Sequence, residues 1–159
     1  MDKGKTCCFT GHRRIPPEDI PFITHALQTE IENQIRQGVL YFGIGGAIGF
    51  DTLAALCVLA LKEKYHSIRL ILVLPCRGQE KFWSKTQQTL YLYILKQADK
   101  AVFLSDSYYR GCMQKRNRYL VDHSDLCICY LTNFTGGTKY TVDYCIKKEI
   151  PVINLADQI

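Results

Sequence analysis

A turn with three glycines joins an apolar stretch to an alanine- and leucine-rich segment in the N-terminal half of the chain. The apolar stretch, residues 39–44, is short, rich in β-branched and aromatic residues and bounded by glycine, which predicts a buried strand. The segment from Thr52 onward has apolar residues on every turn and good helix formers, which predicts a mostly buried helix. The turn between them, residues 45–51, therefore joins a strand to a helix.

This strand–turn–helix arrangement is typical of an anion site. Glycines leave room and permit positive φ, and a helix N-terminus offers free N–H groups and the positive end of the helix dipole. We therefore expect a phosphate to contact the turn at Gly45, Gly46, Ala47, Gly49 and Asp51. Two alternatives stay open. The turn could need glycine only for its geometry, and Asp51 could cap the helix as well as, or in place of, binding a ribose hydroxyl.

The same alternation of strand and helix continues along the whole chain. Strands are predicted at residues 5–10, 39–44, 68–74, 101–104, 126–131 and 152–155, and helices at residues 18–37, 52–65, 84–98, from about 112 to 121 and from about 138 to 148. Strands linked by single helices run parallel with right-handed crossovers, and the strands are apolar on both faces. The pattern predicts one Rossmann-like, three-layer α/β/α domain over residues 1–159, with an open, mostly parallel sheet of about six strands.

In such a sheet the ligand lies outside the carboxyl ends of the strands, so the loops after strands carry the expected site. After the first strand come Gly11, His12 and Arg13. Arg13 can pair with a phosphate through two hydrogen bonds, and His12 can donate to a phosphate or take part in acid–base chemistry. The alternative is a solvated basic loop.

Two further segments are predicted to complete the site. Gly136, Gly137 and Thr138 form a second glycine turn that opens a helix, where Thr138 can cap the helix and hydrogen-bond a phosphate. Arg116 and Asn117 lie on the preceding helix, toward the expected site. Two glycine turns, each after a strand and each opening a helix, make one nucleotide site more credible than either turn by itself.

Aromatic and basic residues in two other loops suggest a different role. Trp83 follows the third strand and can stack on a base, although packing at the edge of the core is favoured. Tyr108, Tyr109 and Arg110 are the local candidates for stacking and phosphate contacts with a single strand.

Charge and hydropathy indicate which classes of partner the protein can bind. A net charge of +5 with a pI near 8.7 suits an anionic small molecule but argues against nucleic acid as the partner. No apolar run is long enough to cross a membrane, and the N-terminus lacks the apolar core of a signal peptide, so we expect a cytoplasmic protein. A homo-oligomer is compatible with the sequence.

The eight cysteines fall mostly within predicted strands and helices and show no CxxC pair. We therefore expect free, packed thiols, with no disulfide and no metal site. Cys112, at the start of a predicted helix, is the thiol to test for reactivity, with packing as the favoured alternative.

Two common nucleotide motifs are absent. The glycine spacing is not G-x-G-x-x-G, and no G-x-x-x-x-G-K-[ST] occurs, which argues against an ordinary dinucleotide dehydrogenase and against a P-loop protein.

Four segments in combination resemble the YpsA-like branch of the SLOG superfamily, which also holds the DprA recombination mediators and the LOG phosphoribohydrolases. They are FTGHR at residues 9–13, GGAIGFD at 45–51, RNRYLVD at 116–122 and GGT at 136–138. The resemblance spans essentially the whole chain. It implies a Rossmann-like fold that binds a nucleotide or nucleotide derivative, such as ADP-ribose, NAD or a nucleoside monophosphate, and a link to bacterial cell division.

The resemblance also implies two alternative functions. LOG enzymes carry PGGxGTxxE, whose glutamate takes part in N-glycosidic cleavage. Residues 135–143 here lack the proline and the second Gly-Thr, and Asp143 stands in place of the glutamate. We therefore expect a nucleotide-binding sensor or regulator rather than an enzyme. The first alternative is a nucleoside-monophosphate phosphoribohydrolase, with Asp143 or Asp51 as the carboxylate and Arg116 on the phosphate. The second is a DprA-like single-stranded DNA binder.

Overall fold

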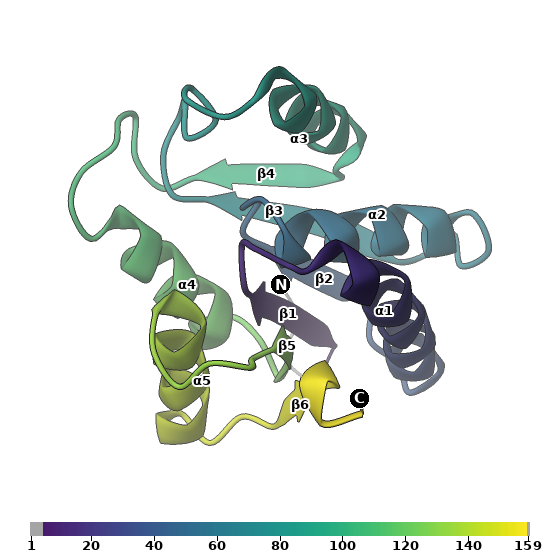
Figure 1. Ribbon diagram of the computed structural model, residues 1–159. Coiled ribbons are helices and arrows are strands. Elements are labelled where there is room, and N and C mark those ends of the chain that lie inside the picture. Colours follow the sequence, from purple (N-terminus) through teal and green to yellow (C-terminus); the bar gives the residue numbers. More distant parts are fainter. Residues whose placement is uncertain (1–4, 159) are drawn as a thin grey trace.

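Six strands pair in parallel into one open sheet, in the order β4-β3-β2-β1-β5-β6 (Figure 1). The computed structural model describes residues 5–158. The strands are β1 (Thr6–Gly11), β2 (Tyr41–Ile44), β3 (Arg69–Leu74), β4 (Lys100–Phe103), β5 (Leu126–Tyr130) and β6 (Val152–Asn154). The helices are α1 (Ile20–Arg36), α2 (Phe50–Lys62), α3 (Lys85–Gln97), α4 (Cys112–Asp122) and α5 (Gly137–Lys147), with 3-10 turns at Pro17–Asp19 and Leu155–Gln158. The predicted Rossmann-like α/β fold is confirmed.

Two helix starts differ from the prediction. The first α-helix begins at Ile20, after a separate 3-10 turn, rather than at residue 18. Pro21 fits the first turn of α1 because its missing N–H would have no helical acceptor there. The helix α2 begins at Phe50 rather than Thr52, which places Asp51 inside the helix instead of in the turn before it.

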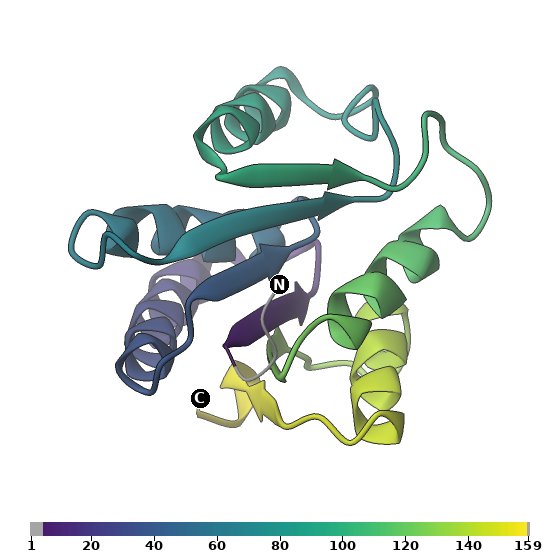
Figure 2. The same ribbon diagram turned by 180° about the vertical axis from the view of Figure 1, so that it is seen from behind.

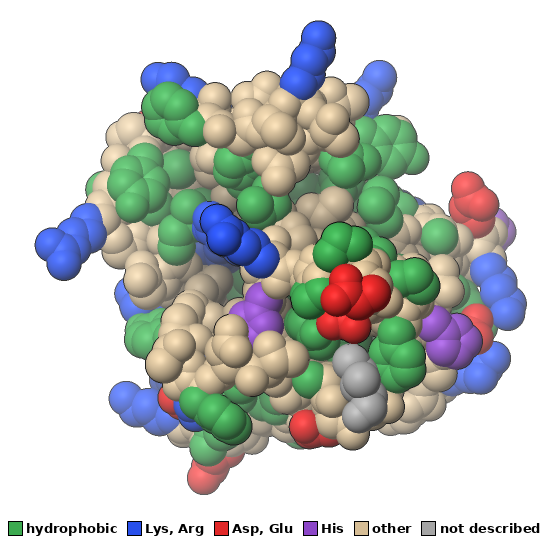
Figure 3. Space-filling model, viewed as in Figure 1, with side chains coloured by type: hydrophobic (Ala, Val, Ile, Leu, Met, Phe, Trp, Pro, Cys, Tyr) green, Lys and Arg blue, Asp and Glu red, His purple; other side chains and the backbone are tan. Residues whose placement is uncertain are grey.

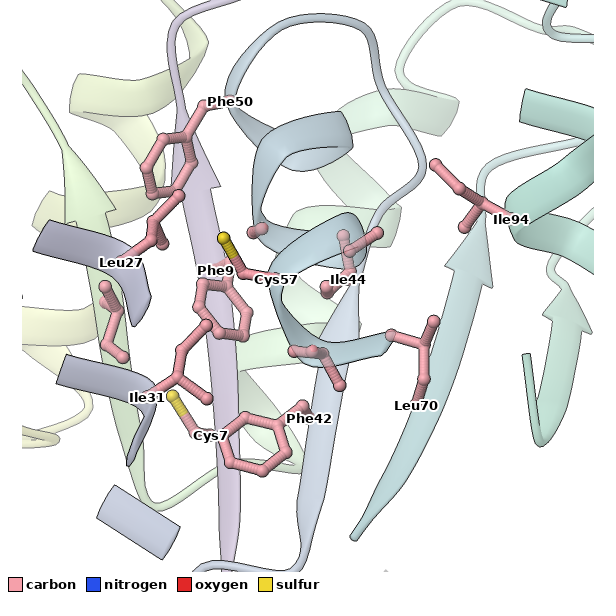
Figure 4. Close-up of a cluster of buried hydrophobic side chains, with 14 of the residues drawn as sticks. Cys7, Phe9, Leu27, Ile31, Phe42, Ile44, Phe50, Cys57, Leu70 and Ile94 are labelled. Atoms are coloured by element: carbon pink, nitrogen blue, oxygen red, sulfur yellow. The ribbon is translucent and has the colours of Figure 1, made fainter. Parts of the chain in front are cut away.

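The helices cover the two faces of the sheet unequally. The larger core lies between the sheet and α1, α2 and α3, and its centre is built from Phe9, Phe42, Ile44 and Phe50 (Figure 4). The smaller core lies on the other face, under α4 and α5 (Figures 1 and 2). Side chains of β1 alternate between the two, since Phe9 packs in the first core and Cys8 in the second.

All eight cysteines are free and buried, in keeping with their predicted places in strands and helices. Cys112, at the start of α4, is only 1% exposed, which favours the packing alternative. Within residues 5–158, no helix has the length and apolar character needed to cross a bilayer.

The strand order determines where the sheet has a crevice. The chain first builds outward from β1 to β4 and then returns to add β5 on the other side of β1. The loops after β1 and β5 therefore diverge toward opposite faces of the sheet, and the crevice between them is where open α/β sheets bind ligands.

Candidate functional site

A cavity of about 220 Å³ opens at this reversal of the strand order. Its walls come from the end of β1 and its loop, the β2–α2 glycine turn, the first turns of α4 and the turn that begins α5. The lining residues are 9–13, Ala47, Asp51, Met113, Gln114, Arg116, Asn117 and 135–138. Four segments that are far apart in the sequence thus meet at one place.

Arg116 is the central charged group, although it is only 4% exposed. Its Nη1 donates a hydrogen bond to the carbonyl oxygen of Gly45, and its Nε donates to Oδ1 of Asn117 at 2.8 Å. A Cβ at Gly45 would lie 2.6 Å from that Nη1. The glycine at position 45 therefore leaves room for the guanidinium of Arg116, which comes from α4. The local sequence around Gly45 gives no sign of this contact.

Asp51 holds the glycine turn from the inside. Its Oδ2 accepts a hydrogen bond from the backbone N–H of Ala47 at 3.1 Å. The predicted cap is wrong, because α2 has Gly49 at its N-cap and no side-chain cap. Burial raises the pKa of Asp51, while the positive charge of Arg116 acts to lower it. The two buried charges therefore depend on each other.

Two glycines let the β1 loop and the glycine turn pack together. Gly49 has φ +79°, and a Cβ there would lie 2.3 Å from the carbonyl oxygen of Arg13. A Cβ at Gly11 would lie 2.3 Å from the ring of Phe50. Gly46 also has positive φ, at +72°. At these positions the protein's own packing and backbone geometry require glycine. This is the alternative to a phosphate contact that the sequence leaves open.

His12 is held by a backbone group from the other side of the crevice. Its Nε2 accepts a hydrogen bond from the N–H of Thr132 at 2.9 Å, and its ring meets Tyr130 edge-on, with ring centroids 5.8 Å apart. An Nε2 that accepts leaves the proton of the neutral ring on Nδ1. Partial burial lowers the pKa of His12, so at neutral pH the side chain offers one N–H donor.

This arrangement predicts how stability depends on pH. The pKa of His12 is lower in the folded protein than in the unfolded chain, so its contribution is full above about pH 6.5 and is lost as the pH falls through the folded value. Protonation would also remove the acceptor for Thr132. Between pH 7.5 and 5, the free energy of unfolding measured in urea should decrease less for His12→Asn than for the wild type. NMR should show Nδ1–H on His12 with a pKa below 6.5; a higher pKa would contradict the assignment.

The turn at the start of α5 is the part of the cavity whose hydrogen-bond donors lack acceptors. The first hydrogen bond of this turn runs from Tyr140 N–H to Gly136 O at 3.0 Å, so the N–H groups of residues 137–139 have no acceptor among the described residues. The hydroxyl of Thr138 likewise makes no hydrogen bond in the described chain. The predicted cap by Thr138 is wrong because Gly136 occupies the N-cap and Thr138 lies within the first turn.

Arg13 is the exposed cation of the site. It lines the first cavity and two adjoining clefts. Its Nη2 lies 3.8 Å from the sulfur of Met113, and Nη2 of Arg116 lies at the same distance from that sulfur. The side chain is thus free to move toward a ligand, whereas Arg116 is held in place.

Asp143 lies apart from the other predicted residues. It is on the exposed side of α5, where its Oδ1 pairs with Nζ of Lys139 at 2.6 Å, and it does not line the cavity. Helical phase is the reason: Thr138 and Val142 turn toward the sheet, and the following residue turns to solvent. No group of three or more His, Cys, Asp or Glu side chains that could hold a metal ion exists within residues 5–158.

The fold and the cavity define a Rossmann-like domain with a crevice at the strand-order reversal. The family model described as the YspA SLOG family, YpsA, matches residues 10–152, and the chain belongs to this family. The SPbeta prophage-derived protein YoqJ of Bacillus subtilis is 31% identical over 128 residues, which cover 73% of this chain and 72% of that protein. The UPF0398 protein BH1768 of Halalkalibacterium halodurans is 32% identical over 133 residues, 82% of this chain and 70% of that protein.

Two solved structures share the fold. DNA processing protein A from Helicobacter pylori, whose structure was described for its single-stranded DNA binding mode, superimposes with a TM-score of 0.68 at 17% identity, over 98% of this chain and 71% of that chain. The X-ray structure of TM1055 gives a TM-score of 0.59 at 14% identity, over 97% of this chain and 79% of that chain. The predicted membership of the SLOG superfamily is confirmed.

Proposed function

We propose that the protein binds a nucleotide or nucleotide derivative and acts as a ligand sensor or regulator. The observation that carries this proposal is the set of unpaired donors on one side of the cavity. The backbone N–H groups of Gly137 and Thr138 and the Thr138 hydroxyl belong to residues that line the same cavity as Arg13. A helix N-terminus with a nearby guanidinium is a strong phosphate site.

The rest of the cavity suits a sugar or a second polar group. His12 supplies a donor from the β1 side, and the amide of Asn117 lies on the α4 side. Because Arg116 and Asp51 hold the glycine turn, the cavity is formed before any ligand enters. A preformed site binds more tightly because less ordering is needed on binding.

A thermal-shift series tests the proposal directly. We expect AMP, ADP-ribose or NAD to raise the melting temperature; a ligand at about 100 times its Kd stabilises by about 2.7 kcal/mol, or about 5–10 °C for a domain of this size. Ribose 5-phosphate separates recognition of the phosphate and sugar from recognition of the base. Absence of a shift with every compound would contradict the proposal.

Gly137→Ala is predicted to weaken binding without unfolding the protein. A Cβ at Gly137 would meet no atom within 4 Å, and alanine favours a helix, so stability should stay within about 0.5 kcal/mol of wild type. The added methyl would stand where a phosphate approaches the N–H groups, so we expect at least about tenfold weaker nucleotide binding by calorimetry.

The matched control on the same helix is Asp143→Asn. It removes only a surface ion pair outside the cavity, so both stability and nucleotide affinity should be nearly unchanged. Equal affinities for Gly137→Ala and wild type would argue against a phosphate at α5.

We expect binding without hydrolysis. Cleavage of an N-glycosidic bond would need a carboxylate that can reach the sugar, yet Asp51 is engaged with Ala47 and Asp143 lies on the outside of α5. Incubation with AMP followed by chromatography should show no free adenine. Enzyme-like release of adenine would replace this proposal with the phosphoribohydrolase.

Single-stranded DNA is the second candidate, and two observations favour it against the prediction from net charge. DNA processing protein A of Helicobacter pylori shares the fold. The rings of Phe82 and Tyr108 are exposed beside Arg77 and Lys81. Tight binding of oligodeoxythymidylate that weakens steeply with salt would support this candidate. We expect mononucleotide-sized ligands to bind better, because the donors at α5 accommodate one phosphate.

A further inference from the structure

A second cavity adjoins the first on the side of β3 and β4. Its volume is about 540 Å³, and it opens between the loop after β3 and the loop after β4. Figure 3 shows apolar side chains at the surface over these two loops, at the upper left of the view. The walls include Arg77, Phe82, Trp83, Tyr108 and Met113.

The rings of this cavity are unusually open for a folded protein. Phe82 is 91% exposed and Tyr108 is 66% exposed. Trp83 packs edge-on against Tyr91 at 5.3 Å between ring centroids, as the favoured alternative from the sequence predicts, and still lines the cavity. Two exposed rings and an anchored indole around one hollow are what a planar aromatic guest needs for stacking.

Met113 connects the two cavities, because it lines both. The thioether is flexible and polarizable, so this boundary can shift to let a ligand pass. At about 220 Å³, the first cavity is smaller than the roughly 300–1,000 Å³ typical of small-molecule sites. A nucleotide with its phosphate at α5 would therefore have to extend into a neighbouring cavity.

Two other clefts adjoin the first cavity at Arg13, and neither suits an aromatic ring as well. The cleft of about 280 Å³ is lined by aliphatic side chains such as Ile15, Ile48 and Leu53. The cleft of about 620 Å³ contains Tyr130, but that ring is only 4% exposed and packs against His12 and Phe50. Exposed aromatic rings are found instead in the cavity between the β3 and β4 loops, which meets the first cavity at Met113.

We propose that the cavity between the β3 and β4 loops is the nucleobase subsite of a nucleotide whose phosphate lies at the start of α5. The base stacks against Tyr108 and Phe82, beside Trp83. Arg77, whose guanidinium lies 4.1 Å from the ring centroid of Phe103, borders the same hollow and can face the base or a second phosphate. This inference rests on the proposed nucleotide binding.

Trp83 is the chain's single tryptophan, so its fluorescence reports on this cavity directly. Titration with AMP should quench or shift the emission of Trp83, because a stacked base changes the surroundings of the indole. Ribose 5-phosphate, which has no base, should bind with little change in emission. An oligodeoxythymidylate titration shows whether a base carried by a DNA strand enters the same subsite.

Two variants test the rings without disturbing the fold, since both side chains are mostly exposed. Phe82→Ala and Tyr108→Ala should each weaken AMP binding about tenfold and leave the affinity for ribose 5-phosphate unchanged. Tyr93→Ala is the matched control, because Tyr93 is 51% exposed on α3 and lines neither cavity. It should bind AMP as wild type does.

The outcomes separate this inference from the proposed function. AMP binding with no change in Trp83 emission and no loss in either variant would overturn the base subsite and leave nucleotide binding in place. Absence of binding by AMP, ADP-ribose, NAD and ribose 5-phosphate would overturn both. Equal losses for AMP and ribose 5-phosphate in Tyr108→Ala would also overturn the base subsite, since the ring would then not act on the base.

Discussion

Replacing Arg116 with methionine is expected to lower the free energy of unfolding by about 3 kcal/mol and to abolish nucleotide binding. Methionine fills a similar volume, so the loss comes from the charge and its hydrogen bonds rather than from a cavity. The carbonyl of Gly45 would lose its donor, and the buried carboxylate of Asp51 would lose its compensating charge. The glycine turn that shapes one wall of the site would then no longer be held. Urea unfolding and calorimetry with AMP measure the two effects.

The partner variant is Asp51→Asn, which keeps an oxygen to accept from Ala47 N–H and removes the charge. If the two charges depend on each other, the double variant should be more stable than the sum of the single losses predicts. Additive losses would contradict the coupling.

A pH series gives a second signature of the same pair. Burial raises the pKa of Asp51 above the ordinary 3.8, and without Arg116 it should rise further. The cost of an ionised, buried Asp51 is full above its folded pKa and vanishes below its unfolded pKa. The deficit of Arg116→Met should therefore be largest near neutral pH and shrink toward about pH 4.

Gly49→Ala should destabilise the protein by at least about 3 kcal/mol. The positive φ at this position costs an L-residue about 1–2 kcal/mol. The larger part comes from the close approach, since the new Cβ would lie 2.3 Å from the carbonyl oxygen of Arg13 and backbone cannot rotate away. The β1 loop and the glycine turn would be forced apart, which should also weaken nucleotide binding.

Gly38→Ala separates the two causes. Gly38 also has a positive φ, +105°, but a Cβ there would meet nothing within 4 Å. It should therefore lose only about 1–2 kcal/mol in urea unfolding, with no change in nucleotide affinity. Similar losses in the two variants would show that backbone conformation, and not the packing of the loops, requires Gly49.

The fold could be predicted because its signals are local. Short apolar runs that alternate with helical segments specify a parallel, doubly covered sheet, and the carboxyl ends of such strands must meet at one edge. The loops at residues 11–13, 45–51 and 136–138 are accordingly predicted to lie together. Residues from all three line one cavity, although from the glycine turn only Ala47 and Asp51 do so. The helices α1 and α2 begin two residues away from their predicted starts, because Pro21 and the glycine turn determine where these helices begin.

The roles within the site could not be predicted, because they depend on contacts between distant segments. Arg116 was expected on a phosphate, but its hydrogen bonds go to Gly45, 71 residues away, and to Asn117. The tautomer of His12 depends on Thr132, 120 residues away. The resemblance to the LOG motif makes Asp143 a candidate catalytic carboxylate, but the phase of α5 turns this side chain to solvent.

Periodicity and the order of strands and loops are enough to predict the architecture and the edge of the sheet at which the candidate site lies. Which glycines make room for the protein's own atoms, and which leave open space, depends on how distant segments pack and can be seen only in the folded structure. At Gly45 and Gly49 the space beside the backbone is taken by Arg116 and by the β1 loop, whereas at Gly137 it is empty. A glycine looks the same in a sequence in both cases, because what occupies the volume where its side chain would be is decided by packing.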